Sequence, residues 1–470
     1  MTHVLKRIFS CQYMLKEEDR LGDIPSDREG YKRAINMAWP SIIESVLLAM
    51  VTLIDTLMVS SLGEEAVAAV GITSQPRLIV LALIFSLNIG VTAVVARRKG
   101  QKDQDGANRC LKQCMKICAV ISILLAVLCT VFSDALLRFA GAGEDYIGDA
   151  STYFRILMMG IFFNAMSLTI NAAQRGVGNT KISMRSNLTA NLVNLVLNYF
   201  LINGHWIFPK WGVAGAAVAT SVGYVVAFGM SLASICHRKD NAFLSIFSDA
   251  SWKWDKATLA SVYKVSSSAV VEQFFMRVGF FLYAKIVAGL GTTDFATHQV
   301  CMNIMSISFG FGDGFNVASS SLVGQSLGAK RPDMAKLYAS INQRMAMICS
   351  TVLALVLIVF RYNILSLFSE DPLVIKNGGV LLIMIACVTH AQTSQVIISG
   401  SLRGAGDTKF VAICSMISIA LIRPALSWVM AYPLGWGLFG AWIAVLVDQY
   451  LRLVLFFARF RSGEWTKIEL

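Results

Sequence analysis

An apolar run of about twenty residues recurs twelve times along this 470-residue chain. Inside a bilayer every backbone N–H and C=O must be hydrogen-bonded within the protein, so such a run can cross only as an α-helix. The composition agrees, because 56% of the residues are hydrophobic and only 15% are charged. We therefore expect an all-α integral membrane protein with twelve transmembrane helices. The predicted spans are 35–60, 66–96, 108–133, 148–173, 182–203, 212–236, 258–288, 294–324, 335–361, 374–401, 410–432 and 437–459.

The net charge of +12 does not indicate a nucleic-acid partner, because of where the basic residues lie. Of the 41 lysines and arginines, 31 lie in the terminal segments and the even-numbered connections, whereas the intervening connections hold four. Cytosolic loops carry such an excess. We expect a multi-pass protein of the cytoplasmic (plasma) membrane with both termini in the cytosol. The segment 1–34 lacks the apolar core of a secretory signal, so we expect it to be solvated and amphipathic.

The chain repeats itself at an offset of 228 residues. The octapeptide "QRGVGNTK" at 174–181 returns as "LRGAGDTK" at 402–409, and "WGVAGAA" at 211–217 meets "WGLFGAW" at 436–442 after a three-residue deletion. Two copies of a six-helix unit enter the membrane in the same orientation. We therefore expect two lobes related by a pseudo-two-fold axis along the membrane normal, as in secondary transporters. The expected parts are a cytosolic segment 1–34, an N-lobe 35–237, a cytosolic linker 238–257, a C-lobe 258–460 and a cytosolic tail 461–470.

The repeated octapeptide predicts a tight cytosolic elbow between the fourth and fifth helix of each half. Its glycines permit a turn with positive φ, and Lys181 and Lys409 would lie at the cytosolic membrane face. A phosphate-binding loop is the alternative. The octapeptide lacks the full spacing of that motif and follows no predicted strand, which favours the elbow.

Several motifs in order resemble the multidrug and toxic compound extrusion (MATE) family over residues 34 to 466. Besides the paired elbows they are "WP" at 39–40, "IDTLMVSSLG" at 54–63, "NLVNLVLNYFLI" at 191–202, "GVAGAAVAT" at 212–220, "LVGQSLGA" at 322–329 and "FRSGEW" at 460–465. The resemblance implies a prokaryotic transporter, closer to the DinF-like than to the NorM-like branch of the wider superfamily. It also implies an antiporter, driven by H⁺ or Na⁺, that exports amphipathic cationic organic compounds by alternating access. No cofactor besides the coupling ion, no enzyme activity and a monomeric state are expected.

Positions that are polar in one half of the repeat and apolar in the other are unlikely to serve the scaffold that both halves share. The predicted fifth helix carries a polar face, whereas its counterparts in the second half are mostly apolar. This face holds Asn187, Asn191, Asn194 and Asn198, at helical spacing. Asp55 likewise matches Tyr283, and Thr220 matches Val445. The first half therefore holds an acid, amides and a hydroxyl at positions that the second half leaves largely apolar.

Asp55 lies ~12 Å inside the outer end of its helix, at ~1.5 Å per residue. An ionisable group at that depth usually faces a cavity or a partner. Such a carboxylate can take up a proton or Na⁺ on one side and release it on the other; the alternative is a structural acid held by the asparagines. By the MATE resemblance Asp55 is the acid of the N-lobe site, and Asn194, Asn198 and Thr220 are its hydrogen-bonding neighbours.

Pro40 lies fifteen residues before Asp55, so it must either bend this helix or begin it. In the MATE family a bend of this helix accompanies proton uptake. Some relatives carry an Asp where this chain has Asn198. This chain therefore has one titratable group at the expected site instead of two.

Five other polar residues at membrane depth are secondary candidates. They are Glu44, Arg77, Glu272, Asp313 and His390. Glu44 and Glu272 match each other at the repeat offset, which favours a scaffold or gate role over substrate capture.

The remaining secondary candidates leave alternatives open. Asp313 matches Phe85, so it is a candidate acid of a C-lobe site, and Arg277 or Lys285 could pair with Asp313 or with Glu272. A titrating or a hydrogen-bonded packing role is open for His390, and Arg77 could restrain Asp55 or Glu44. Asp448 is expected to serve packing or gating.

Three cysteines, Cys110, Cys114 and Cys118, recur at helical spacing in the third span. We interpret them as a packed thiol stripe and expect no metal site, because a metal would need further ligands nearby. No nucleophile–base pair appears that would indicate a membrane-embedded enzyme. The main alternative function is a flippase or exporter of a lipid-linked precursor or metabolite, which few basic residues at mid-depth disfavour. The asymmetric repeat disfavours a channel.

Overall fold

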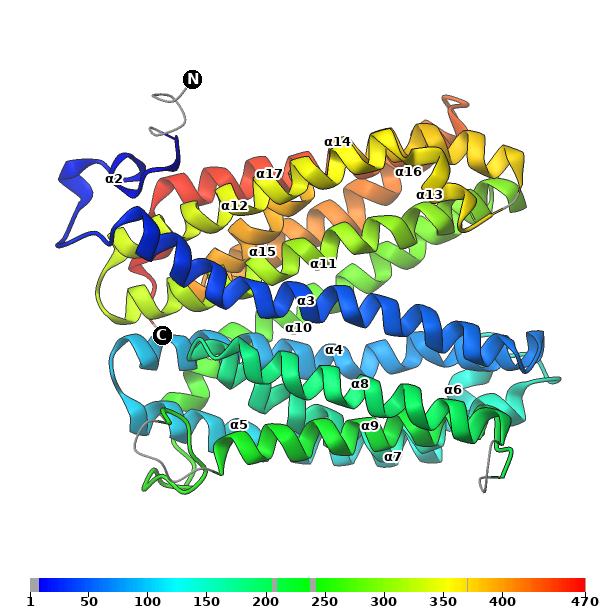
Figure 1. Cartoon of the computed structure of the whole chain (residues 1–470), viewed down its shortest axis with the longest axis horizontal. Helices are drawn as coiled ribbons and strands as arrows, with labels where there is room; N and C mark the ends of the chain where they lie inside the picture. The colour runs from blue at the N-terminus through cyan, green and yellow to red at the C-terminus, as the bar shows by residue number, and fades with distance from the viewer. Residues whose placement is uncertain (1–7, 205–208, 237–241, 370, 470) are drawn as a thin grey trace. The chain divides into compact units, whose positions relative to one another are not determined.

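The computed structural model describes residues 8–204, 209–236, 242–369 and 371–469, and these form helices without a strand. Figure 1 labels the helices along the chain. Their bounds are α2 (Cys11–Met14), η1 (Glu17–Asp19), α3 (Asp27–Ser60), α4 (Glu64–Gly100), α5 (Gln104–Val131), α6 (Ser133–Phe139), α7 (Ile147–Gly176), α8 (Thr180–Asn203), α9 (Gly212–Ile235), α10 (Lys256–Ala288), α11 (Thr292–Gly328), α12 (Pro332–Val359), α13 (Arg361–Ser366), α14 (Pro372–Ala405), α15 (Thr408–Ser415), η2 (Met416–Ile422), α16 (Arg423–Ala431), α17 (Gly437–Ser462) and η3 (Glu464–Lys467).

Twelve long helical segments occupy the twelve predicted spans, with α15, η2 and α16 together forming the eleventh. Within the described ranges, nine helical segments are long and apolar enough to cross a membrane. The other three, α8, α10 and α11, have the length but a more polar sequence. The short helices α6 and α13 were not predicted. They directly follow α5 and α12, the helices of the third and ninth spans, which end at Val131 and Val359.

The helices form two compact units that divide the chain within α3 and within α10. Unit 1 comprises residues 1–45 and 267–470, and unit 2 comprises residues 46–266. The first part of α3 therefore packs with the second half of the sequence, and the first part of α10 packs with the first half. The lobe boundaries expected from the sequence, 35–237 and 258–460, follow the repeat instead of these contacts.

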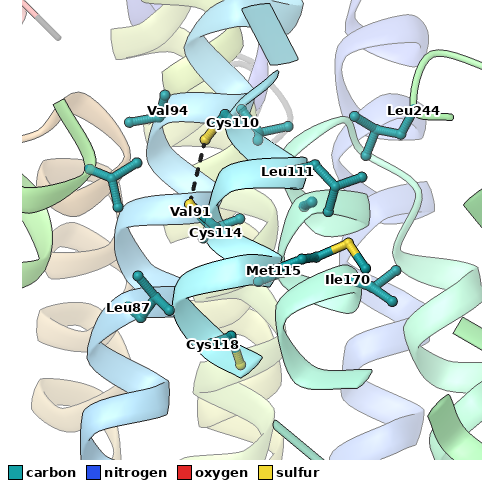
Figure 2. Close-up of a cluster of buried hydrophobic side chains, with 14 of the residues drawn as sticks. Leu87, Val91, Val94, Cys110, Leu111, Cys114, Met115, Cys118, Ile170 and Leu244 are labelled. Carbon is teal, nitrogen blue, oxygen red and sulfur yellow. Dashed lines mark hydrogen bonds between the residues drawn. The ribbon is translucent and has the colours of Figure 1, made fainter. Parts of the chain in front are cut away.

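Unit 2 is built around two hydrophobic clusters on α4, α5, α7 and α9. α7 packs against both α4 and α9, and α8 packs against α9 (Figure 1). The predicted thiol stripe lies in the first cluster. Figure 2 shows Cys110, Cys114 and Cys118 along α5 among apolar side chains of α4 and α7. The Sγ atoms of Cys110 and Cys114 are 3.9 Å apart, and all three thiols are fully buried, as the packing interpretation requires.

Unit 1 is organised around α11 and α14, which pack against each other and against α12. Its three hydrophobic clusters all include residues of α11, α12 and α14, and two of them also include α17. The last cluster includes Trp465 of η3, which is fully buried, stacks on Phe460 and donates its indole N–H to the Phe460 carbonyl at 2.8 Å. The residues after α17 therefore fold back onto unit 1.

The two repeated octapeptides form the predicted elbows, one in each unit. The chain turns from α7 into α8 through Gly178 at φ +91°, and from α14 into α15 through Gly406 at φ +93°. A side chain at either position would be strained, because L-residues rarely adopt positive φ. In unit 2 the first elbow glycine is also needed for packing, since a Cβ on Gly176 would lie 2.9 Å from the Thr92 carbonyl oxygen.

Most described residues of the N-terminal segment are exposed, which agrees with the predicted solvated, amphipathic character, but a few of its residues pack against other helices. Cys11 is fully buried in a cluster with residues of α3, α11, α12 and α14, and its N–H donates to Asp27 at 2.6 Å. The N–H of Leu21 donates to Asp333 of α12 at 3.1 Å. The apolar residues of this segment are few and show no regular spacing, so its own sequence does not reveal the surface on which they pack. Residues 1–7 lie outside the described residues.

The described part of the predicted linker, 242–257, packs on α5. Lys112, almost fully buried, donates to the carbonyl oxygens of Ser248 and Ala250, both at 2.8 Å, and Gln113 donates to that of Lys253 at 3.0 Å. These bonds satisfy backbone acceptors of an irregular segment, which would otherwise need water. Residues 238–241 of the linker lie outside the described residues.

Candidate functional site

Asp55 lies on α3 in unit 2, half-buried and five residues before the end of this helix. Its carboxylate accepts a hydrogen bond from the Asn198 side chain of α8, with 2.9 Å between Nδ2 and Oδ1. Asn198 is 2% exposed. The contact therefore joins two residues that are 143 positions apart in the sequence, and it does so inside the helices of one unit.

Asn194, one turn before Asn198, contributes a second amide donor. Its amide is oriented with the nitrogen toward Asp55, because the opposite orientation would turn its oxygen onto acceptors and its nitrogen onto donors. In this orientation Nδ2 lies 3.2 Å from Oδ1 and 3.1 Å from Oδ2 of Asp55, and the amide oxygen accepts from the Thr220 hydroxyl at 3.1 Å. The structure thus brings together Asp55, Asn194, Asn198 and Thr220, from α3, α8 and α9.

The charge on Asp55 meets amides but no cationic side chain. Among the described residues, no lysine, arginine or histidine lies within ion-pair distance of its carboxylate. The Oδ1 atom of Asn198 is buried beside it without a hydrogen-bond partner in the described chain. The carboxylate can take up a proton, and the carboxylate together with the free amide oxygen can ligate Na⁺, so the arrangement leaves the charge available to a small cation.

Two residues predicted near Asp55 do not contact its carboxylate. Asn191 lies on α8, half-buried, and makes no hydrogen bond to Asp55. No ion pair joins Arg77 to Asp55 among the described residues, and the restraint of Asp55 or Glu44 by Arg77 stays a prediction. The Nε atom of Arg77 is buried without a hydrogen-bond partner in the described chain.

Unit 1 holds its own buried acid at membrane depth, but this acid is neutralised by the protein. Asp448 of α17 is fully buried and forms ion pairs with Arg423 of α16 and with Arg452, the latter at 3.0 Å. Ser418 of η2 also donates to its carboxylate. The Arg423 guanidinium lies 5.3 Å from the Phe280 ring centroid and 5.9 Å from that of Tyr283.

The π-helical turn η2 places this triad. It interrupts the α-helix between α15 and α16, and the extra residue of a π turn rotates everything that follows. The matching helix of unit 2, α8, has no such interruption in the described chain. Sequence reasoning expected Asp448 to serve packing or gating and did not pair it with either arginine. The available signal was the presence of opposite charges in neighbouring apolar spans.

Glu272 is likewise paired within unit 1. Its Oε1 accepts from Nη2 of Arg403 at 2.6 Å, and Glu272 is 1% exposed. Arg403 belongs to the second elbow, so this ion pair joins α10 to the end of α14. The possible pairing of Glu272 with Arg277 or Lys285 is therefore wrong in this structure.

The other secondary candidates lie apart from Asp55. Asp313 of α11 accepts from the Asn316 amide at 2.9 Å and has no ion-pair partner within the described residues. His390 of α14 contacts Thr351 Oγ1 at 3.1 Å, which agrees with a hydrogen-bonded packing role. Glu44 is half-buried on α3. Pro40 lies inside α3, so it does not begin the helix; the backbone acceptor four residues earlier loses its usual donor there.

Known proteins resemble this chain over most of its length. The family model MatE matches residues 40–200 and 268–429. The uncharacterized transporter YisQ of Bacillus subtilis is 26% identical over 430 residues, covering 92% of this chain and 94% of its own length. A probable multidrug resistance protein NorM of Thermotoga maritima is 26% identical over 456 residues, covering 97% of this chain and 96% of its own.

A solved structure agrees with these matches. The outward-facing conformation of a multidrug resistance MATE family transporter of the MOP superfamily superposes with a TM-score of 0.86 at 20% identity, covering 92% of this chain and 95% of that one. At this identity the likeness concerns the fold alone. The predicted all-α fold class, with twelve transmembrane helices in two lobes, is confirmed.

Proposed function

This chain belongs to the MatE family of multi-pass membrane transporters, and on that premise we propose that it is an antiporter that exports amphipathic organic cations in exchange for H⁺ or Na⁺. Asp55 is the carboxylate at which the coupling cation binds. Asn194 and Asn198 hold this carboxylate, and Thr220 orients the Asn194 amide. The cytoplasmic (plasma) membrane location, cytosolic termini and monomeric state expected from the sequence form part of the same proposal.

One observation carries the proposal: amides of Asn194 and Asn198 hold the half-buried Asp55 carboxylate, and no cationic side chain among the described residues pairs with it. A buried carboxylate is unfavourable when charged and unpaired, so uptake of a proton or Na⁺ lowers its free energy. An organic cation that binds near the same carboxylate competes for the same negative charge. Alternating occupancy of one charge by two cations is sufficient to couple their movements.

The amides give the site its reversibility. A hydrogen bond from Asn198 or Asn194 stabilises the charged carboxylate, which offsets part of the unfavourable burial. An arginine in the same place would neutralise Asp55 permanently and remove its need for an exchanging cation. The free Oδ1 of Asn198 can accept a hydrogen bond from protonated Asp55 or can ligate Na⁺.

Transport by the purified protein in liposomes tests this proposal. Vesicles loaded with ethidium would be placed first under a proton gradient and then under a sodium gradient, with empty vesicles as the baseline. We expect ethidium movement under one of the two gradients, and this result identifies the coupling ion. Absence of movement under both gradients would contradict the proposal and favour a lipid-linked precursor or a metabolite as cargo.

A further inference from the structure

One face of α10 carries cationic and aromatic side chains that the proposed coupling site does not use. This face lies entirely in the part of α10 that belongs to unit 1. The face comprises Gln273, Phe274, Arg277, Phe281 and Lys285, which we call the Arg277 stripe. At about 100° per residue these side chains fall within roughly one third of the helix circumference.

The Arg277 stripe points away from the body of unit 1. The opposite face of α10 is buried: Glu272 and Tyr283 are 1% and 2% exposed, and Gly279 approaches the backbone of Ile419. On the stripe, Phe274 is 63% and Phe281 69% exposed. The stripe is therefore an outward face and contributes little to the packing of unit 1.

Arg277 has no anionic partner. No ion pair or hydrogen bond joins its guanidinium to another side chain in the parts of the chain that the structure describes, and its Nε atom is buried without an acceptor. The remaining arginines of the α10 neighbourhood are engaged, because Arg403 pairs with Glu272 and Arg423 pairs with Asp448. Arg277 is thus a cation that the packing of unit 1 does not require.

At its depth in the membrane, contact of the Arg277 guanidinium with lipid tails would be energetically unfavourable. Eleven residues separate it from the end of α10 at Ala288, which is ~16 Å at ~1.5 Å per residue and about half of the hydrocarbon thickness. Lys285, three residues from that end, can extend to the interface, but an arginine at the centre cannot do so without distorting the bilayer. An ionisable residue at this depth normally faces water or a ligand.

The repeat provides a control for this argument. The residues of the first half that match Phe274, Arg277 and Phe281 at the offset of 228 are Val46, Ala49 and Leu53. Ala49 is exposed, as an outward position should be. A scaffold role shared by both halves therefore does not require a guanidinium here, just as it does not require an acid at Tyr283, the counterpart of Asp55.

We propose that the Arg277 stripe is an anion subsite that binds the carboxylate of an aromatic, zwitterionic substrate, and this rests on the proposed export function. A guanidinium offers a planar pair of donors that fits a carboxylate. Phe274 and Phe281, three residues before and four after it, supply apolar surface for an aromatic body. No carboxylate lies on the stripe, so it repels the cationic centre of a substrate and fixes which end binds there.

Binding of a matched pair of dyes tests the subsite without any transport. Rhodamine B carries a carboxylate beside its cationic ring system, and its ethyl ester keeps the ring system but lacks the negative charge. Fluorescence anisotropy would give the Kd of both dyes for the detergent-solubilised protein, with empty micelles as the baseline. The variants are Arg277→Gln and Arg277→Lys, with Arg361→Gln as a control for removing an arginine of unit 1 outside the stripe.

We expect the wild type and Arg361→Gln to bind rhodamine B at least ~10-fold more tightly than the ester. Arg277→Gln should bring the two Kd values within ~2-fold by weakening rhodamine B alone, and Arg277→Lys should retain part of the preference. Equal affinities in the wild type, a preference that survives in Arg277→Gln, or equal weakening of both dyes would overturn the proposal. Phosphatidylglycerol would also be added to the micelles. If it displaced rhodamine B but left binding of the ester unchanged, the proposal would be overturned in favour of a site for a lipid phosphate.

A transport assay separates this proposal from the function on which it rests. In liposomes, Asp55→Asn should stop gradient-driven movement of both dyes while rhodamine B binding keeps its preference over the ester. If the wild type moves neither dye but binds rhodamine B selectively, the export function fails and the subsite stands. If both dyes move equally well and bind equally well, the export function stands and the subsite fails.

Discussion

Units 1 and 2 both bury carboxylates within membrane helices, but they neutralise them in different ways. In unit 2 the carboxylate of Asp55 receives amide hydrogen bonds and no ion pair from the described residues. In unit 1 the carboxylates of Asp448 and Glu272 are held by arginines. A guanidinium remains charged at every relevant pH, so an acid paired with it has no reason to exchange a cation. The difference therefore separates an acid suited to coupling from acids suited to structure.

The same difference appears at matched positions of the repeat. Tyr283 stands in unit 1 where Asp55 stands in unit 2, and the Arg423 guanidinium lies near its ring. In unit 1 an arginine side chain, that of Arg423, therefore lies next to Tyr283, the residue that matches Asp55. We infer that unit 1 carries no exchanging site at the position that matches Asp55, because its two almost fully buried membrane-depth carboxylates, those of Glu272 and Asp448, are paired with arginines.

The largest expected effect comes from breaking a closed pair. Asp448→Asn leaves the guanidinium groups of Arg423 and Arg452 buried without their carboxylate, which should lower the free energy of unfolding by about 3–5 kcal/mol. Thermal unfolding in detergent measures this loss. Glu464→Gln, which removes an exposed ion pair with Lys467, is the control and should leave the free energy of unfolding nearly unchanged. Equal stability of the two variants would mean that the triad does not stabilise unit 1.

Asp55→Asn should have the opposite profile, with lost function and retained stability. The asparagine keeps the shape of the side chain but cannot bind a proton or neutralise a cation, so gradient-driven ethidium transport should fall by at least ~100-fold, equivalent to about 2.7 kcal/mol. Transport in liposomes and unfolding in detergent are the two measurements. The outcome that sinks the prediction is gradient-dependent transport at the wild-type rate by a folded variant.

Asn198→Leu gives unit 2 the residue that unit 1 carries at the matching position, Leu426. One hydrogen bond to the Asp55 carboxylate is lost, and a bond to a charged group contributes about 1.5–3 kcal/mol, so transport should fall by roughly 10- to 100-fold without being abolished. Initial rates of ethidium movement at several pH values check this. Unchanged rates would show that the Asn198 amide does not support the coupling carboxylate.

The elbows should respond alike, because they belong to the shared scaffold. Gly178→Ala and Gly406→Ala each place a side chain at positive φ, which should cost roughly 1–2 kcal/mol of unfolding free energy in either unit. Gly229→Ala, at a helical position with open space around it, is the control and should be neutral or stabilising. A large cost at one elbow and none at the other would contradict the shared role.

The smallest expected effect is the pH-dependent contribution of Asp134 of α6 to stability, because this acid is exposed, unlike the acids discussed above. The Ser151 hydroxyl, together with Arg155 and Arg138 and against some burial, holds the pKa of this carboxyl below its ordinary value. Its contribution to stability is therefore complete above the ordinary pKa of about 3.9 and is lost as the pH falls through the lower folded value. Asp134 and Arg155 are 57% and 44% exposed, so the contribution should stay within ~1 kcal/mol.

Unfolding of Asp134→Asn and of the wild type would be compared at about pH 6 and at about pH 2.5, on either side of the ordinary pKa. The wild type should be slightly more stable at the higher pH, and the difference between the two proteins should shrink at the lower pH. A difference that grows on acidification would contradict the assigned sign.

Much of this molecule could be predicted because its physical constraints are local. Apolar length determines the spans, and the glycine turns of the octapeptides determine the elbows. The meeting of Asp55 with Asn198 was expected from the one-sided polar residues and from the family resemblance. The triad of Arg423, Asp448 and Arg452 was not predicted, because η2 shifts the register of α16 and no sequence period reports such a turn.

Long-range packing also limited what the sequence could indicate. The burial of Cys11 depends on a surface formed by α3, α11, α12 and α14, which its own neighbours in the sequence do not reveal. The linker lies on α5 because lysine and amide side chains of that helix bind its carbonyl groups. A lysine in a basic helix end is normally expected to be solvated, so the sequence did not indicate that Lys112 would bind the linker.

The central claim, that Asp55 is the site of the exchanging cation, is tested most directly by competition in binding. The Kd for ethidium would be measured in detergent against pH without sodium, and against sodium at constant pH, for the wild type, Asp55→Asn and Asp313→Asn. The account predicts that one of the two cations raises the Kd at least ~10-fold in the wild type and in Asp313→Asn, and leaves it unchanged in Asp55→Asn. An equal rise in Asp55→Asn, or its loss in Asp313→Asn alone, would contradict the account.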